Sequence, residues 1–192
     1  MDRTNVNRKA FKTIDMVYIA VGAVLISVCS WISIPTLIPF TMQTFGVFCV
    51  LSALGGKRGT TAIILYLAIG AVGVPVFANF SAGLSAFLDS TGGYLIGFIF
   101  TGLVFWLAES VLGRKLWVEI ASLIVGLLVC YAFGSVWFMI VYSQANEAVG
   151  FATAIAWCVA PFIIPDLVKL GIAMILVKRI PVVPGRGKES TG

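Results

Sequence analysis

Six apolar stretches, separated by breaks rich in charged residues, glycine or proline, organise the chain. They span residues 16–34, 42–54, 60–74, 94–112, 116–141 and 149–177. The second and third hold 13 and 15 residues. As helices they would rise only ~20–22 Å, short of the ~30 Å hydrocarbon core of a bilayer. The pattern therefore predicts six helices, two of them short, with neighbouring loops that enter the bundle and are buried in protein or line a cavity.

The amino-acid composition indicates that these helices lie in a membrane. Of the 192 residues, 60% are hydrophobic and only 11% are charged, and the mean hydropathy is +1.06. Soluble domains are closer to half apolar and a quarter charged. We therefore predict an all-α integral membrane protein with one membrane domain over residues 1–192. It comprises a cytoplasmic segment at 1–14, a bundle of six transmembrane helices at 15–178 and a cytoplasmic tail at 179–192.

The basic residues predict the orientation. Twelve of the thirteen Lys and Arg residues lie before the first stretch or after the second, fourth and sixth. With six crossings, all four of these breaks lie on one face. The positive-inside rule places that face, and both termini, in the cytoplasm. We therefore expect a multi-pass protein of the plasma membrane. The net charge of +5 thus reflects orientation in a lipid bilayer and not a nucleic-acid site.

The breaks on the opposite face are unusually apolar. Residues 35–44 include two prolines and end in Gln43 and Thr44, and residues 75–93 form a 19-residue connection whose one charged residue is Asp89. Solvated loops are more polar. We expect partly buried outer loops, with 75–93 folded over the bundle as a lid. A re-entrant packing loop without a ligand is the alternative.

The remaining basic residue, Lys169, lies inside the sixth stretch, three residues after Asp166. Charges at bilayer depth cost ~2.5–3.5 kcal/mol on insertion scales, so they usually face a partner, a cavity or a substrate. Pro161 and Pro165 precede the pair, and interrupted membrane helices often border binding sites. On a helix both side chains face one side and can reach one cavity. The alternative is an internal ion pair that joins two helices.

Other polar groups lie in or beside the outer segments: Gln43, Thr44, Asn79 and Tyr94. With Asp166 and Lys169 they suit a ligand that has an anionic end and an amide-like end. Gly92 and Gly93 allow either a close backbone approach to that ligand or a tight turn into the next helix. Trp31, Phe77, Phe80 and Phe87 are candidates for apolar walls.

Several classes of site are disfavoured. The chain has no histidine, and its four cysteines lie in apolar stretches without a C-x-x-C pair, so we expect no metal site and small buried thiols. Glu109 and Glu119 lie close to the break that holds Arg114 and Lys115, which predicts a pairing or snorkelling role near the surface. Ala20, Ala23 and Ser27 form a stripe of small residues on the first helix that suits an internal seam or a partner.

Three blocks together resemble a known family. PFTMQT at 39–44, TGGYLIGF at 91–98 and PFIIPDLVK at 161–169 occur in family order. The chain resembles the BioY family, the biotin-specific S components of energy-coupling-factor (ECF) vitamin transporters. The resemblance implies six helices, a biotin pocket near the extracellular face, and ligand contacts from Asp166, Lys169 and Asn79. It also implies one transmembrane coupling protein and two cytoplasmic ATPases as partners.

The implied ligand is compatible with the polar set. The carboxylate of biotin suits Lys169, its ureido N–H groups suit Asp166, and Asn79 or Gln43 suits the rest of the ureido ring. No G-x-x-x-x-G-K-[ST] motif occurs, so ATP would be used by the partners and the chain itself needs no cofactor. In the family, docking is ascribed to Ala-x-x-x-Ala on the first helix, but Val24 stands four residues after Ala20.

Three other functions remain open. The chain could serve another carboxylated vitamin as S component or permease, or act as an assembly protein with a structural Asp166–Lys169 pair. A membrane enzyme that uses Asp166 as acid or base is disfavoured, because the sequence has neither histidine nor a Gly-x-Gly-Asp motif or nucleophile elbow.

Overall fold

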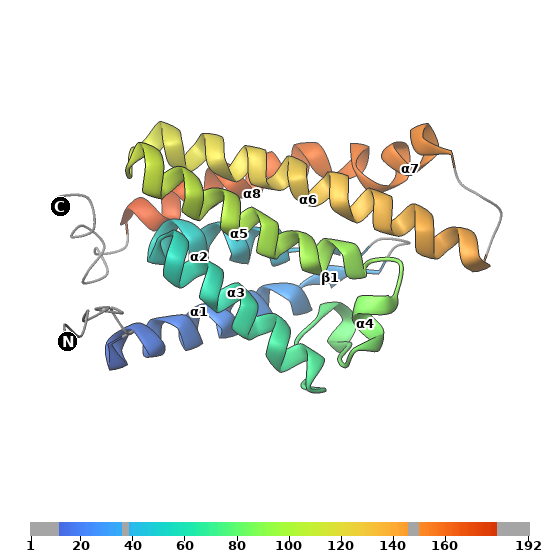
Figure 1. Cartoon of the computed structure of the whole chain (residues 1–192), viewed down its shortest axis with the longest axis horizontal. Helices are drawn as coiled ribbons and strands as arrows, with labels where there is room; N and C mark the ends of the chain where they lie inside the picture. The colour runs from blue at the N-terminus through green and yellow to red at the C-terminus, as the bar shows by residue number, and fades with distance from the viewer. Residues whose placement is uncertain (1–11, 36–38, 146–149, 180–192) are drawn as a thin grey trace, which may run out of the picture.

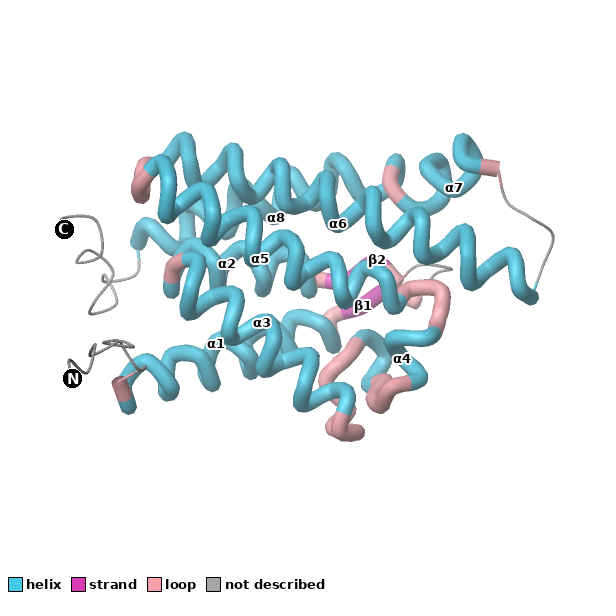
Figure 2. The backbone as a smooth tube through the Cα atoms, viewed as in Figure 1, coloured by secondary structure: helices cyan, strands magenta, loops and turns pink. Residues whose placement is uncertain are grey.

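The computed structural model describes residues 12–35, 39–145 and 150–179. Most of the predicted cytoplasmic segment 1–14 and tail 179–192 therefore lies outside the described residues, as do parts of the 35–44 and 142–148 breaks. Within the described ranges the chain is almost entirely helical, with one two-stranded hairpin (Figures 1 and 2). The elements, in chain order, are α1 (Thr13–Trp31), β1 (Ser33–Ile34), β2 (Phe40–Thr41), α2 (Gln43–Leu54), α3 (Gly56–Ala71), η1 (Ala78–Phe80), α4 (Ser85–Leu88), α5 (Gly92–Leu112), α6 (Leu116–Ala145), α7 (Phe151–Cys158) and α8 (Ala160–Arg179).

Each predicted apolar stretch contains a helix, and the sixth contains two. α1, α5, α6 and the α7–α8 segment are long and apolar enough to cross a membrane, whereas α2 and α3 have 12 and 16 residues. The predicted all-helical membrane architecture is thus present, with four candidate spans among the residues that the structure describes. The division of the sixth stretch at Val159 was not predicted. Pro161 lies in the first turn of α8, where its missing N–H costs little. In an uninterrupted helix it would remove the hydrogen bond to the Trp157 carbonyl, so this proline favours a break directly before α8.

Small residues let α5 and α6 pack closely as an antiparallel pair (Figure 1). A Cβ atom added at Gly93 would lie 2.3 Å from Cβ of Trp137, and one added at Gly134 would lie 2.3 Å from the ring of Tyr94. Both distances are far inside van der Waals contact. Membrane helices associate largely through such packing, since lipid tails offer no hydrophobic driving force between helices.

The outer segments fold over one end of the bundle. β1 and β2 pair antiparallel, with Ser33 opposite Thr41 (Figure 2). η1 and α4 are short helical turns within the 75–93 connection, which lies beside this hairpin (Figure 1). Ser33 Oγ donates to Asn79 Oδ1 at 3.0 Å, and Trp31 stacks on Phe80 with ring centroids 5.4 Å apart. The two outer segments therefore contact each other directly.

The opposite end carries charged side chains. The start of α1, the α2–α3 and α5–α6 turns and the end of α8 all lie there (Figure 1). Asp15 at the start of α1 pairs with Arg58 of α3 at 2.7 Å. This end also holds Lys178 and Arg179 in the last turn of α8. The side chains of Ala23 and Ser27 are buried, so this part of the small-residue stripe on α1 is an internal seam.

Candidate functional site

A cavity of about 540 Å³ lies beneath the outer segments and is bounded by the helices on the hairpin side of the bundle. Its volume is in the range of small-molecule sites, ~300–1,000 Å³. Apolar groups form most of the wall, and polar groups gather where α2, α6 and α8 meet. The lining comprises Pro39, Thr41, Gln43, Thr44, Phe77, Ala78, Ser81, Ala82, Ser85, Ala86, Leu88, Asp89, Thr91, Tyr94, Leu95, Phe98, Leu127, Cys130, Tyr131, Cys158, Phe162, Asp166 and Lys169.

α8 positions two of the three charged residues that line this cavity, Asp166 and Lys169; the third, Asp89, comes from the 75–93 connection. Asp166 and Lys169 are 2% and 5% exposed, and Lys169 Nζ lies 2.8 Å from Asp166 Oδ1. Their i,i+3 spacing places both on the inner face of the helix, as the sequence predicted. Pro165 lies inside the helix directly before Asp166. The pair is therefore held at the end of α8 that adjoins the cavity, where the α7–α8 break interrupts the helix.

The ammonium group of Lys169 has an acceptor for each of its three protons. It donates to the Thr41 carbonyl at 2.7 Å, to Thr44 Oγ1 at 3.2 Å and to Asp166 Oδ1 at 2.8 Å. Its Nζ also lies 4.2 Å from the centroid of the Phe40 ring, in a cation–π geometry. Lys169 thus ties α8 to β2 and to the start of α2.

Asp166 is held from two further helices. Thr44 Oγ1 of α2 donates to Oδ1 at 2.8 Å, and the Tyr131 hydroxyl of α6 donates to Oδ2 at 2.5 Å. Such bonds to a charged acceptor are stronger than neutral ones. We call the five residues Thr41, Thr44, Tyr131, Asp166 and Lys169 the pocket cluster. It offers an anionic acceptor and a cation side by side on a cavity wall.

Comparison with known proteins assigns the family. The model of the BioY family matches residues 3–184 of the chain. The chain belongs to the BioY family. Among curated relatives, the biotin transporter BioY of Thermotoga maritima is 39% identical over 159 residues, which cover 81% of this chain and 89% of that protein. The probable biotin transporter BioY of Pyrococcus horikoshii is 38% identical, with coverage of 74% and 80%.

A solved structure has the same fold. The S-component for biotin from an ECF-type ABC transporter matches with a TM-score of 0.77 at 24% identity, covering 93% of this chain and 94% of that one. The resemblance inferred from three short sequence blocks is confirmed by the family match and by this shared fold. At this identity the structural match concerns the fold alone.

Some of the predicted site residues lie on the cavity of this BioY chain. Gln43 and Tyr94 line it together with the pair on α8. Gln43 Nε2 donates to the Tyr66 hydroxyl at 2.8 Å, which orients the amide. The Tyr94 hydroxyl is 3.4 Å from Ser135 Oγ. Residues from α2, α5 and α8, which are far apart in sequence, thus line one cavity, as the prediction of a shared site requires.

Asn79, Gly92 and Gly93 are not among the lining residues. Asn79 is exposed, adopts φ 55°, and bonds Ser33, so in this conformation it joins the outer segments. A Cβ atom at Gly92 would lie 2.0 Å from the Phe87 carbonyl oxygen, and Gly93 abuts Trp137. These contacts explain both glycines by close packing at the start of α5, and their contribution to ligand binding stays a prediction.

Of the four aromatic residues predicted as apolar walls, only some lie at the cavity. Phe77 lines the cavity, and Phe87 supports it edge-on at 5.4 Å between ring centroids. Trp31 and Phe80 stack on each other outside the lining. Phe98 and Phe162, which line the cavity from α5 and α8, were not singled out from sequence.

Sequence reasoning missed Tyr131 and the Thr41 carbonyl. Tyr131 lies within an apolar stretch, where tyrosine carries no signal of its own. Its relation to Asp166 spans 35 residues and two helices, so no local pattern shows it. The Thr41 carbonyl is a backbone group, and its place depends on the register of the hairpin.

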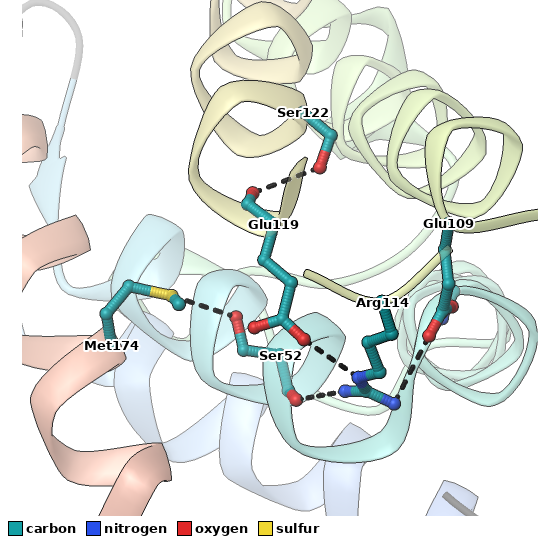
Figure 3. A network of polar contacts seen from close by, with 7 residues as sticks. Ser52, Glu109, Arg114, Glu119, Ser122 and Met174 are labelled. Atoms are coloured by element: carbon teal, nitrogen blue, oxygen red, sulfur yellow. Dashed lines mark hydrogen bonds and ion pairs between the residues drawn. The ribbon is translucent and has the colours of Figure 1, made fainter. Parts of the chain in front are cut away.

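A second, half-buried cluster of charged side chains lies at the other end of the bundle, and Figure 3 shows its contacts. Arg114, in the α5–α6 turn, pairs with Glu109 at 3.2 Å and Glu119 at 2.8 Å. Its guanidinium also donates to the Ser52 carbonyl in the last turn of α2, and Glu109 accepts from the Gly56 N–H at the start of α3. We call Ser52, Gly56, Glu109, Arg114 and Glu119 the clamp cluster. Of the two roles predicted for these glutamates, pairing or snorkelling, the structure shows pairing, with Arg114 as the partner.

Proposed function

We propose that the chain binds biotin in this cavity and mediates biotin uptake as the substrate-specific subunit of an ECF transporter. The observation that carries the proposal is the pocket cluster, a buried Asp166–Lys169 pair on the wall of a 540 Å³ cavity, within a chain of the BioY family. Relatives at 30–39% identity carry the name of biotin transporter. The function is transport, and the chain is not an enzyme.

The chemistry of biotin matches the cavity. Asp166 is an acceptor for a ureido N–H, and the Gln43 amide, which donates one of its two hydrogens to Tyr66, has a second donor for the ligand. The bicyclic ring and the valerate chain suit the apolar wall, which Phe77, Leu95 and Phe98 help to form. Lys169 Nζ lies 2.8 Å from Asp166 Oδ1, so the ureido ring and the carboxylate, at opposite ends of biotin, are alternatives for this position. A carboxylate at Lys169 would also have to replace one of its three acceptors.

For the arrangement in the membrane we propose six crossings with both termini in the cytoplasm. Arg58, Arg114, Lys178 and Arg179 belong to elements that meet at one end of the bundle, and this supports a cytoplasmic position for that end. The cavity, at the other end, would then open toward the extracellular side. α2 and α3 cross as short helices, and the described residues of their outer connections, 33–35, 39–41 and 75–93, are partly buried.

For energy coupling we propose that an ECF transmembrane protein and two cytoplasmic ATPases act with this chain. The sequence lacks a phosphate-binding G-x-x-x-x-G-K-[ST] motif, so ATP hydrolysis belongs to the partners, and this chain needs no cofactor. On α1 the face that includes Ala20 and Val24 is exposed, which makes it available for a partner.

Calorimetry on detergent-purified protein tests the ligand assignment. Titration with biotin should give a 1:1 complex, and a panel of other carboxylated vitamins should bind far more weakly. Tight binding of a different vitamin would reassign the substrate. No ligand in the panel bound would support an assembly role for the pair. Uptake of labelled biotin with and without co-expressed ATPases tests the transport partners.

A further inference from the structure

The acceptor capacity of Asp166 is nearly filled within the protein. A carboxylate offers about four lone-pair positions, two on each oxygen. Oδ1 accepts from both Thr44 Oγ1 and Lys169 Nζ at 2.8 Å, and Oδ2 accepts from Tyr131 at 2.5 Å. Among the residues that the structure describes, one acceptor position therefore remains, on Oδ2.

The donors of the pocket cluster are also committed. All three protons of Lys169 have protein acceptors. The Thr44 hydroxyl donates its hydrogen to Asp166 and accepts from Lys169. The Tyr131 hydroxyl donates its single hydrogen to Asp166. A ligand that enters without breaking these bonds meets one open position on the carboxylate, and only an N–H or O–H group can occupy it.

Tyr131 determines which lone pair of Asp166 Oδ2 stays open for a ligand. Its ring comes from α6, across from α8, and is 6% exposed on the cavity wall. Without the hydroxyl, both lone pairs of Oδ2 would be open. The carboxylate would also lose its one support from α6 and could tilt away from the ligand. A short bond to a buried charge is well suited to fix this orientation.

We propose that Tyr131 is a positioning residue that directs Asp166 Oδ2 toward a single ligand N–H group and so sets the selectivity of the cavity for ureido compounds. The inference rests on the proposed function, since it takes the ligand N–H to be that of biotin. Tyr131 acts through Asp166, because its own hydrogen is already donated there.

The test compares two ligands on two proteins. Tyr131→Phe keeps the ring and removes only the hydroxyl, and biotin methylated at the ureido nitrogens lacks the N–H. The wild-type protein should bind biotin at least tenfold more tightly than the methylated compound. Tyr131→Phe should weaken biotin binding about 10- to 100-fold, because bonds to charged groups are the stronger class, and change binding of the methylated compound less than about threefold.

A matched control and a double variant localise the effect. Tyr142→Phe makes the same chemical change on α6 outside the cavity lining, and it should leave both affinities unchanged. In an Asp166→Asn background, Tyr131→Phe should have little further effect, because residues that act as one unit are not additive. Equal losses for both ligands, or full additivity with Asp166→Asn, would overturn the proposal.

Two further outcomes keep the proposals separate. If wild-type protein binds biotin and the methylated compound equally well, the positioning proposal fails, even if Tyr131→Phe cannot be purified in folded form. If wild-type protein binds neither compound but is folded, the proposed function fails first. Selectivity of the wild type is thus measured before any variant.

Discussion

The pocket cluster and the clamp cluster contain similar groups but use them differently. In the clamp cluster, Arg114 and Glu109 meet backbone groups at the ends of α2 and α3. These charged side chains supply hydrogen-bond partners for backbone N–H and C=O groups that have none within the helix at its ends. In the pocket cluster the pair on α8 meets side chains of α2 and α6 beside a cavity. The charges of the clamp cluster thus complete helix ends, whereas those of the pocket cluster border a cavity, and this supports the proposed ligand role of the pocket cluster.

Sequence distance separates the clusters as well. The charged side chains of the clamp cluster lie within eleven residues, Glu109 to Glu119, around one short turn. The pocket cluster unites segments more than 120 residues apart. Forming such long-range contacts costs more conformational entropy. The clamp cluster also reaches Ser52 and Gly56, 62 and 53 residues from Arg114 and Glu109, so both clusters join distant segments, the pocket cluster over about twice the distance.

The largest effect on binding is expected for Asp166→Asn. The substitution keeps the shape, removes the negative charge and leaves Lys169 without its counter-ion. Loss of one member of a buried charged contact costs ~2–5 kcal/mol, which is about 30-fold to several thousandfold in affinity. Calorimetric titration with biotin measures the change, and the protein should still elute as a folded species.

Glu109→Gln provides the matched control, because it makes the same change in the clamp cluster. It should lower the melting temperature and leave the biotin affinity within about threefold. If Asp166→Asn instead prevents folding even with ligand present, Asp166 belongs with the structural pairs and the distinction between the clusters is lost.

Lys169→Ala should also weaken biotin binding, because Asp166 then loses its cation. Comparison with biotin amide separates two contributions. If the ligand carboxylate replaces the Thr41 carbonyl or Thr44 on Lys169, the loss is greater for biotin than for the amide, as the sequence interpretation predicts. Affinities of both ligands for wild type and variant give the answer. Equal losses would restrict Lys169 to holding Asp166 and the hairpin in place.

Arg114→Ala should mainly lower stability. It leaves Glu109, Glu119 and the Ser52 carbonyl without the guanidinium between them. These side chains are partly exposed, so we expect a loss of ~1–3 kcal/mol, below that of a fully buried pair, and a melting temperature several degrees lower. Arg114→Lys keeps the positive charge, but an ammonium group cannot bond Glu109, Glu119 and the Ser52 carbonyl in the geometry of a planar guanidinium. This variant should therefore recover only part of the lost stability. Weaker biotin binding with unchanged stability would contradict the structural role.

The sequence predicts the helices better than it predicts the site. Apolar periods and basic breaks are local, so the six stretches and the pairing of Glu109 and Glu119 with Arg114 follow from nearby residues. Asp166 and Lys169 were found for the same reason, since charges within an apolar stretch contrast with their neighbours. Their mutual contact follows from the helical repeat alone.

What the sequence could not predict depends on tertiary arrangement. The partnership of Tyr131 with Asp166 requires the relative placement of α6 and α8, and the role of the Thr41 carbonyl requires the hairpin register. Asn79 is a case in which the sequence predicts a role that this conformation does not show. Its predicted ligand role came from resemblance, whereas in this structure its side chain bonds Ser33 and its backbone adopts a left-handed conformation that asparagine tolerates.

The smallest expected effect concerns mobility of the 75–93 segment, which supplies several lining residues from η1, α4 and their flanks. It is fastened to the hairpin by Ser33–Asn79 and to α1 by Trp31 Nε1, which donates to the Pro75 carbonyl at 2.9 Å. We expect this segment to open for biotin exchange and to be held closed by bound biotin, as active-site lids are.

Hydrogen exchange measures this opening. Saturating biotin should slow exchange across 78–91, while the 113–115 turn of the clamp cluster, far from the cavity, serves as internal reference and should not change. Asn79→Ala removes one fastening and should speed exchange of the free protein there. If exchange across 75–93 is the same with and without biotin, the segment is a fixed wall of the cavity. Protection of both regions to the same extent would mean that ligand stabilises the whole bundle, and the two ends would not be energetically distinct.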